Sequence, residues 1–274
     1  AGLEVFTPLG ITAIRHVMGA LALLIVVALM GKWQALFRLP KLLLQRMIVV
    51  SLLLNVIPAY LFAFAQNLVS TVVASIVNSA TPILTLLMIW LVFRSEKITA
   101  LQVTGIFVGL IGGLLALGIS PGSLGDNDPL GVAAVLLAIT CYGFAIPYVR
   151  KYVTPLSSET TLLATSQVAI ASVILIVLYS LESLANQAWI LNPPSSNQLW
   201  QILVLGIGTG IAYIWHFQVI ERAGSAVAST ITYPTLLVSL HIGVIALGEA
   251  FDLQMAIGAG LIVLGSWITQ QRRA

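Results

Sequence analysis

The sequence predicts an all-α integral membrane protein with nine transmembrane helices, arranged as two copies of one repeat in opposite orientations. Composition is the first observation: 59% of the 274 residues are hydrophobic and 8% are charged, with a mean hydropathy of +1.05. A soluble domain carries about 25% charged residues. The chain also contains nine apolar runs long enough to cross about 30 Å of hydrocarbon. The third observation is an internal repeat whose copies are separated by an odd number of spans.

The apolar runs are expected to be helices, because open strands cannot satisfy their backbone groups in lipid. In chain order they cover 9–30, 44–66, 69–92, 98–119, 129–149, 158–181, 199–220, 225–247 and 253–270. The breaks between them carry turn chemistry. Ser120-Pro121-Gly122 ends one helix, and Asn127-Asp128-Pro129 caps and starts the next. The longest break, 183–198, contains Asn192-Pro193-Pro194 and is expected to be a loop.

The repeat is defined by prolines, glutamates and glycines in the same order, with the glutamates and glycines at matching intervals. In each half a proline, Pro82 or Pro234, precedes a glutamate, Glu96 or Glu249. The spacing from the glutamate to the next two matching glycines is the same in both halves; these glycines are Gly105 and Gly112, and Gly258 and Gly265. Thr7-Pro8-Leu9 also matches Thr154-Pro155-Leu156. The two repeats are therefore assigned to 1–119 and 129–270.

Basic residues predict the orientation of the spans. If the nine spans alternate in direction, every Lys and Arg except Arg15 falls on one side of the membrane: Lys32, Arg38, Lys41, Arg46, Arg94, Lys97, Arg150, Lys151, Arg222, Arg272 and Arg273. The positive-inside rule makes this side, which includes the C-terminus, cytoplasmic. Acidic residues gather on the opposite side: Glu4, Asp126, Asp128, Glu182, Glu249 and Asp252.

The repeat also predicts that one helix is missing from this sequence. The second repeat opens with the span 129–149, which comes before Thr154-Pro155-Leu156. The first repeat reaches Thr7-Pro8-Leu9 with no room for an equivalent helix. We therefore expect the intact protein to have one more helix ahead of Ala1, and a natural nine-span protein is the alternative. An in-frame stop codon upstream, with no apolar stretch before Ala1, would contradict this expectation.

Composition and motifs also argue against several classes of protein. Cys141 is the only cysteine, so the chain has no disulfide framework and no Cys-based metal site. The sequence has no basic stripe that could meet phosphates, which excludes a nucleic-acid partner. The metal motif His-Glu-x-x-His does not occur. We therefore expect that the protein is not an enzyme and uses neither a cofactor nor a metal.

The chain resembles the drug/metabolite transporter superfamily, in particular its EamA-type members. The residues that carry the resemblance are Pro82 with Arg94-Ser95-Glu96-Lys97, Pro234 with Leu247-Gly248-Glu249, Arg15, and the stretch from Tyr142 to Lys151. The resemblance implies ten helices in two inverted five-helix repeats, with both termini in the cytoplasm. It also implies alternating access around a central site. Export of amino acids or related small metabolites, across a bacterial inner membrane, is the activity it favours.

Two proline-containing spans carry polar residues that are candidates for the substrate path. These candidates are Asn78, Ser79, Thr81 and Pro82 in the first repeat, and Thr230, Thr232, Tyr233 and Pro234 in the second. A proline inside a helix removes a backbone hydrogen bond and kinks the helix, which frees carbonyl groups to face a cavity. The alternative is a structural kink whose hydroxyl groups bond back to their own turn.

A second set of candidates lies in the spans 44–66 and 199–220. Its members are Asn55, Tyr60, Tyr213 and His216, with Tyr142 and Gln167 as weaker candidates from other spans. Aromatic side chains that face a polar cavity suit amino-acid-like ligands, through stacking and cation–π contact. Ordinary helix packing is the alternative interpretation.

Arg15 is the only basic residue that lies within a span away from its cytoplasmic end. Its side chain either snorkels to the outer headgroups or points inward, where it pairs with a helix end or with an anionic group of the ligand. Imidazole titrates near neutral pH, which would suit proton coupling. However, His16, His216 and His241 are isolated in separate spans, so packing or hydrogen-bonding roles are expected for them.

Two further features are expected to be structural. Glu96 and Glu249 should lie at the membrane interface and cap or orient the helix that follows each of them. Gly105, Gly109 and Gly113 share one helix face and allow close helix packing, either within one protomer or between the protomers of a homodimer.

These observations predict a secondary transporter that moves small, amino-acid-like metabolites across the cell membrane. Its expected partners are a small-molecule substrate and the lipid bilayer. An integral membrane enzyme and a channel-like facilitator are the alternatives. Saturable counter-flow in proteoliposomes would indicate a carrier, whereas product formation from a lipid would indicate an enzyme.

Overall fold

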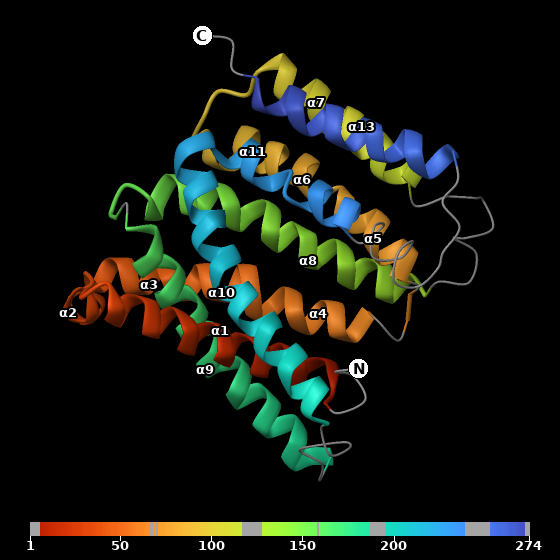
Figure 1. Ribbon diagram of the computed structural model, residues 1–274. Coiled ribbons are helices and arrows are strands. Elements are labelled where there is room, and N and C mark those ends of the chain that lie inside the picture. Colours follow the sequence, from red (N-terminus) through yellow and green to blue (C-terminus); the bar gives the residue numbers. More distant parts are fainter. Residues whose placement is uncertain are drawn as a thin grey trace. The chain divides into compact units, whose positions relative to one another are not determined.

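The computed structural model describes residues 6–65, 68–69, 71–116, 128–157, 159–186, 195–238 and 253–271, and the secondary structure within these ranges is helical (Figure 1). In this part of the chain seven helices are long and apolar enough to span a membrane: Pro8–Leu29, Lys41–Ala65, Val73–Phe93, Pro129–Val153, Thr160–Ala185, Ser196–Ala223 and Leu253–Gln270. Two shorter apolar helices, Ala100–Ala116 and Ser225–Val238, lie within the predicted spans 98–119 and 225–247. The described elements agree with an all-α integral membrane protein.

The chain divides into two compact units, and each unit takes residues from both halves of the sequence. Unit 1 consists of Ala1–Ala63 and Tyr152–Glu221, and unit 2 consists of Phe64–Lys151 and Arg222–Ala274. Neither predicted repeat therefore forms a compact body with its own residues alone.

Unit 1 is built around helices that come from distant parts of the chain. Its elements are α1 (Pro8–Leu29), α2 (Trp33–Phe37), α3 (Lys41–Ser51), a π-helical turn (Leu52–Val56), most of α4 (Ile57–Ala65), α9 (Thr160–Asn186) and most of α10 (Ser196–Ala223). Helix α1 lies along α9, and α3 also packs on α9 (Figure 1). Thr7 begins α1 by accepting the Gly10 N–H at 3.1 Å, and its hydroxyl donates to the Glu182 carboxylate at 2.7 Å. The helix start is therefore attached to the far end of α9.

Unit 2 contains the remaining helices. They are α5 (Thr71–Ser79), α6 (Thr81–Met88), a π-helical turn (Ile89–Phe93), α7 (Ala100–Ala116), α8 (Pro129–Tyr148), most of a further π-helical turn (Val149–Val153), α11 (Ser225–Ser229) and α13 (Leu253–Gln270). Residues 232–238 are also helical. Helix α8 packs against α5 and α6, and α7 lies beside α13 (Figure 1). Asp128 accepts the Leu130 N–H at 2.8 Å and Pro129 takes the first helical position, as the sequence predicts.

The repeated glycines form the contact between α7 and α13. A Cβ atom built on Gly112 would lie 2.8 Å from the Gly258 carbonyl oxygen, and one built on Gly105 would lie 2.6 Å from that of Gly265. Only glycine permits this backbone approach. Gly105 therefore has the predicted packing role, and this contact lies within one protomer. The other two glycines of the predicted face, Gly109 and Gly113, lie against the Tyr233 and Leu236 side chains.

Both proline-containing helices are interrupted ahead of the proline. Helix α5 ends at Ser79 and α6 begins at Thr81, so Pro82 lies in the first turn of a new helix. In the second half α11 ends at Ser229 and the helical residues resume at Thr232, two positions before Pro234. The predicted kink at the proline is therefore corrected to a break before it. A proline at a helix start loses no hydrogen bond, because that N–H has no partner within the helix.

The capping role expected for Glu96 also needs correction. Its Oε1 accepts the Ser225 backbone N–H at 2.8 Å, so it caps α11 and not the helix that follows it in sequence. That helix, α7, begins with a reciprocal pair: Thr99 N–H donates to Gln102 Oε1 at 3.0 Å, and Gln102 N–H donates to Thr99 Oγ1 at 3.2 Å.

Several sequence predictions fall outside the described residues. They concern Glu4, Ser120-Pro121-Gly122, Asp126, Asn127, Asn192-Pro193-Pro194, His241, Leu247-Gly248-Glu249-Ala250, Asp252, Arg272 and Arg273.

Candidate functional site

Five polar residues of unit 1 gather inside apolar membrane-spanning helices, and we call them the polar cluster: Arg15 and His16 of α1, Asn55 of the π-helical turn after α3, Gln167 of α9 and Tyr213 of α10. His16, Asn55 and Gln167 expose only 1%, 3% and 0% of their surface. Polar groups at such positions are costly unless they have hydrogen-bond partners or bind a ligand.

The Asn55 side-chain amide is the centre of the cluster. Its Nδ2 donates to Tyr213 Oη at 2.6 Å and lies 2.9 Å from His16 Nε2, and its Oδ1 accepts from Gln167 Nε2 at 2.6 Å. Because Nδ2 is a donor, His16 Nε2 must accept. The other ring nitrogen, Nδ1, then donates to the Thr12 carbonyl at 2.7 Å. The hydrogen bonds thereby define the neutral Nδ1–H tautomer of His16.

Local backbone features bring these helices together. The Ser51 hydroxyl lies 2.7 Å from the Met47 carbonyl and 2.9 Å from the Gln167 carbonyl, which holds α9 against the end of α3. Helices α1 and α10 approach closely at glycines, because a Cβ built on Gly19 would lie 3.0 Å from the Gly206 carbonyl oxygen. The His16 and Tyr213 rings are 6.5 Å apart, centroid to centroid.

The polar cluster keeps hydrogen-bonding capacity that the described residues do not use. Within the described ranges, Arg15 Nε and Gln167 Oε1 are buried without a hydrogen-bond partner. Tyr213 Oη accepts from Asn55, and its own hydrogen meets no acceptor in the described part of the chain. The Arg15 guanidinium is close enough to His16 and Tyr213 to interact electrostatically with both. Two unused donors, one of them cationic, complement a carboxylate group.

Three sequence candidates, Arg15, Asn55 and Tyr213, belong to this cluster. The sequence predicts packing or hydrogen bonding for His16 and makes Gln167 a weaker candidate. The signal that could have found them is their residue type, since each is a strongly polar side chain within an apolar run. The structure does not bring Tyr60 to the cluster: it is 56% exposed on α4. His216 is half-buried one turn after Tyr213 on α10 and has no hydrogen bond to a described residue.

The proline-associated candidates of unit 2 bond mainly within their own turns. The hydroxyl of Thr81 donates to the Asn78 carbonyl at 2.7 Å, that of Thr230 to the Val227 carbonyl at 2.8 Å, and that of Thr232 lies 3.4 Å from the Ser229 carbonyl. This pattern matches the structural alternative.

The other candidates of unit 2 differ in burial. Ser79 and Pro82 are buried, Tyr142 is half-buried and Pro234 is exposed. Tyr233 is fully buried, and its hydroxyl donates to the Ile106 carbonyl of α7 at 2.8 Å. Tyr233 therefore attaches its helix to α7.

No group of three His, Cys, Asp or Glu side chains that could hold a metal ion occurs among the residues that the structure describes.

Comparisons with known proteins agree with a transporter. The model of the EamA-like transporter family matches residues 1–118 and 129–270. An uncharacterized transporter from Archaeoglobus fulgidus is 27% identical over 206 residues, which is 75% of this chain and 70% of the relative. A solved crystal structure of a protein with 18% sequence identity superposes on this chain with a TM-score of 0.76. The match covers 96% of this chain and 88% of the solved chain, which supports the fold. Since the family model covers nearly the whole chain, the protein is a membrane transporter that belongs to the EamA-like transporter family.

Proposed function

We propose that the protein is a secondary transporter that exports small, amino-acid-like metabolites by alternating access, and that the polar cluster binds the substrate. The observation that carries this proposal is the hydrogen-bonded group of buried His16, Asn55 and Gln167 with half-buried Tyr213, within membrane-spanning helices. Polar residues at membrane depth usually mark a ligand or ion pathway.

The unused groups of the cluster suggest how an amino-acid-like substrate would bind. The Arg15 guanidinium and the Tyr213 hydroxyl supply donors for a carboxylate, which forms its strongest hydrogen bonds with a guanidinium. The unpaired Gln167 Oε1 supplies an acceptor for an ammonium or amide N–H. A substrate with both groups would satisfy every unused atom named above.

The repeated helix breaks support alternating access. Each predicted repeat, 1–119 or 129–270, contains one helix that is interrupted just before a proline. Discontinuous helices of this kind recur in transporters built from inverted repeats, where they rearrange around the substrate site. We propose the same arrangement here: two inverted five-helix repeats, with the basic loops and the C-terminus in the cytoplasm.

Counter-flow in proteoliposomes tests this function. The purified protein is first screened for thermal stabilisation by amino acids, small carboxylates and amines, and the best ligand is then used with a radioactive label. A carrier takes up labelled substrate faster when unlabelled substrate is present inside the vesicle, and the rate saturates. An uptake rate that rises linearly with substrate concentration, and that does not change when unlabelled substrate is present inside the vesicle, would instead indicate a channel-like facilitator. Vesicles of known orientation give the direction of transport.

A further inference from the structure

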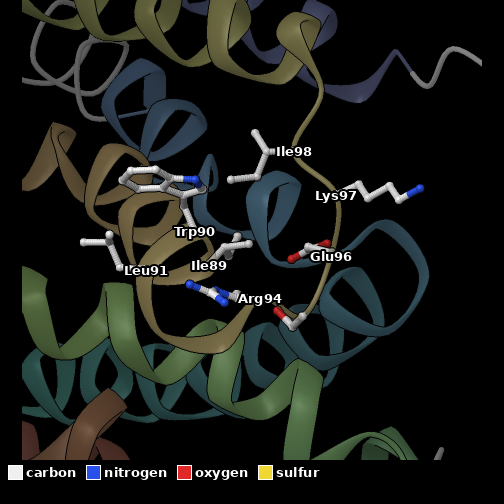
Figure 2. Close-up of a pocket in the computed structure, with 8 residues that line it drawn as sticks. Ile89, Trp90, Leu91, Arg94, Glu96, Lys97 and Ile98 are labelled. Atoms are coloured by element: carbon white, nitrogen blue, oxygen red, sulfur yellow. The ribbon is translucent and has the colours of Figure 1, made fainter.

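A pocket of about 840 Å³ lies at the end of a membrane-spanning helix of unit 2, and its chemistry is unlike that of the polar cluster. It is lined by residues 89–91 and 94–98 (Figure 2). The span Val73–Phe93 ends next to the pocket, so the pocket is located where hydrocarbon gives way to headgroups. In Figure 2 the chain leaves the π-helical turn at Arg94 and continues past Glu96 and Lys97 to Ile98.

The polar wall of the pocket carries two cations, Arg94 and Lys97, and one carboxylate, Glu96. Arg94 and Lys97 are exposed, and neither forms an ion pair or a side-chain hydrogen bond with any residue in the described ranges. Glu96 Oε1 accepts the Ser225 N–H at the start of α11, and its charge leaves the wall with one more cation than anion. The Ser95 hydroxyl also lines the pocket, and its oxygen is buried with no hydrogen-bond partner in the described part of the chain.

The other wall of the pocket is apolar and faces outward. Trp90 is 67% exposed and Leu91 is 53% exposed, although both belong to a membrane-spanning helix. Trp90 is three residues before the end of the span, about 4.5 Å along a helix axis. Tryptophan is enriched at this depth, where its ring contacts acyl chains and its N–H reaches the headgroups.

The backbone at Arg94 suggests that its side chain has a use. The Arg94 backbone is left-handed, with φ of 48° and ψ of 36°, a conformation that residues other than glycine, asparagine and aspartate rarely adopt. Glycine or asparagine would normally end a helix in this way. The matching segment of the second repeat, Leu247-Gly248-Glu249-Ala250, has no basic residue, so the repeat itself does not require cations here.

We infer that this pocket binds an anionic phospholipid, with the phosphate beside the Arg94 guanidinium and the acyl chains along Trp90 and Leu91. Lys97 adds positive charge from the other side of the chain segment. Basic pockets at the ends of membrane helices recognise such headgroups. The free Ser95 hydroxyl supplies a donor for a phosphate oxygen. This site lies within unit 2 and does not depend on the transport activity proposed above.

Quenching of Trp90 by brominated lipids tests the inference. The protein is placed in nanodiscs that contain phosphatidylglycerol or phosphatidylcholine, with bromine on acyl carbons near the headgroup. The difference between wild type and Trp90→Phe isolates the signal of Trp90. We expect this signal to be quenched more by brominated phosphatidylglycerol than by brominated phosphatidylcholine. Trp215, on α10 of unit 1 and 63% exposed, is the matched control, and Trp215→Phe should reveal no preference.

Two variants identify the cations. Arg94→Asn keeps a residue that tolerates the left-handed backbone, and Lys97→Gln changes an exposed side chain that the fold does not need. Each should reduce the preference for phosphatidylglycerol, and together they should abolish it. Equal quenching by both lipids in the wild type, or an unchanged preference in Lys97→Gln, would overturn the proposal. If soluble glycerol phosphate removes the preference, the site binds free phosphates, which also overturns the lipid assignment.

Discussion

Both polar atoms of the Asn55 side-chain amide form hydrogen bonds within the polar cluster. Replacing Asn55 by leucine therefore measures how much the cluster contributes to the stability of the fold. Asn55→Leu leaves His16 Nε2, Tyr213 Oη and Gln167 Nε2 without this partner. Each lost hydrogen bond is worth on the order of 1 kcal/mol within a membrane protein. We expect the free energy of unfolding, measured by SDS titration in mixed micelles, to fall by about 1–3 kcal/mol. Asn78→Leu, at a half-buried position, should lower it less.

The two tyrosines that the sequence marked as candidates give a matched pair for transport. Tyr213→Phe removes a hydroxyl from the polar cluster, whereas Tyr60→Phe removes one from an exposed position on α4. If the Tyr213 hydroxyl binds the substrate, its loss should raise the apparent KM about fivefold, which corresponds to about 1 kcal/mol. Tyr60→Phe should leave the KM unchanged. Initial counter-flow rates measure both, and equal KM values for the two variants would exclude Tyr213 from the substrate site.

Two substitutions at Arg15 distinguish an inward, substrate-binding side chain from one that snorkels to the outer headgroups. Arg15→Lys keeps the charge but lacks the planar pair of donors that suits a carboxylate, and Arg15→Gln also lacks the charge. At normal protein levels we expect counter-flow to fall about tenfold or more in both variants, since a charge-assisted hydrogen bond contributes about 1.5–3 kcal/mol. Wild-type rates in Arg15→Lys would support snorkelling to the outer headgroups.

The sequence allowed the cluster members to be recognised individually but not their assembly. A polar side chain inside an apolar run is expected to face other helices, which is why Arg15, Asn55 and Tyr213 were candidates. Which helices they meet depends on tertiary packing, because Asn55 and Gln167 are 112 positions apart. The same limit explains Tyr60: its residue type suited a cavity, but its place on α4 exposes it.

At the scale of helices, the contact between α7 and α13 can be tested by comparing a glycine inside the contact with one outside it. A Cβ at Gly112 would lie 2.7 Å from Ile262 N, so Gly112→Ala must push the two helices apart. Gly260 lies on α13 outside the contact, and no neighbouring atom lies within 4 Å of a Cβ built on it. We expect Gly112→Ala to lower the free energy of unfolding by about 1–3 kcal/mol. Gly260→Ala should raise it by up to about 1 kcal/mol, because alanine favours a helix.

The thermal midpoint in detergent measures both glycine variants. If Gly112→Ala were as stable as wild type, α7 and α13 would not be in backbone contact.

Elements defined by local chemistry were predictable, and elements defined by distant partners were not. The span 253–270 agrees with α13 (Leu253–Gln270), and the cap at Asp128 was visible in the sequence, because a cap needs only its neighbours. The break between α5 and α6 was placed at Pro82 instead of before it. The partner of Glu96 could not be predicted from local rules, because Ser225 lies 129 positions away.

For the molecule as a whole, the distribution of basic residues predicts a topology that labelling can check. Cys141 is the only native cysteine and is buried, so Cys141→Ser provides a background without thiols. Gln34→Cys and Lys97→Cys lie in predicted cytoplasmic breaks, and Ser195→Cys precedes α10 on the predicted opposite side. A membrane-impermeant maleimide added to intact cells should label Ser195→Cys alone. Labelling of all three positions, or of Lys97→Cys alone, would contradict the nine-span topology.

The mixed origin of the two compact units has a consequence for biosynthesis. His16 and Asn55 emerge from the ribosome early, whereas Gln167 follows Asn55 by 112 positions and Tyr213 follows it by 158. At about 5–20 residues per second, the two early groups wait roughly 5–30 s for these partners. During that interval water or the insertion machinery has to solvate an imidazole and an amide that the nascent chain does not yet cover. Ribosome pausing within the second half would lengthen that exposure and favour degradation of the unfinished protein.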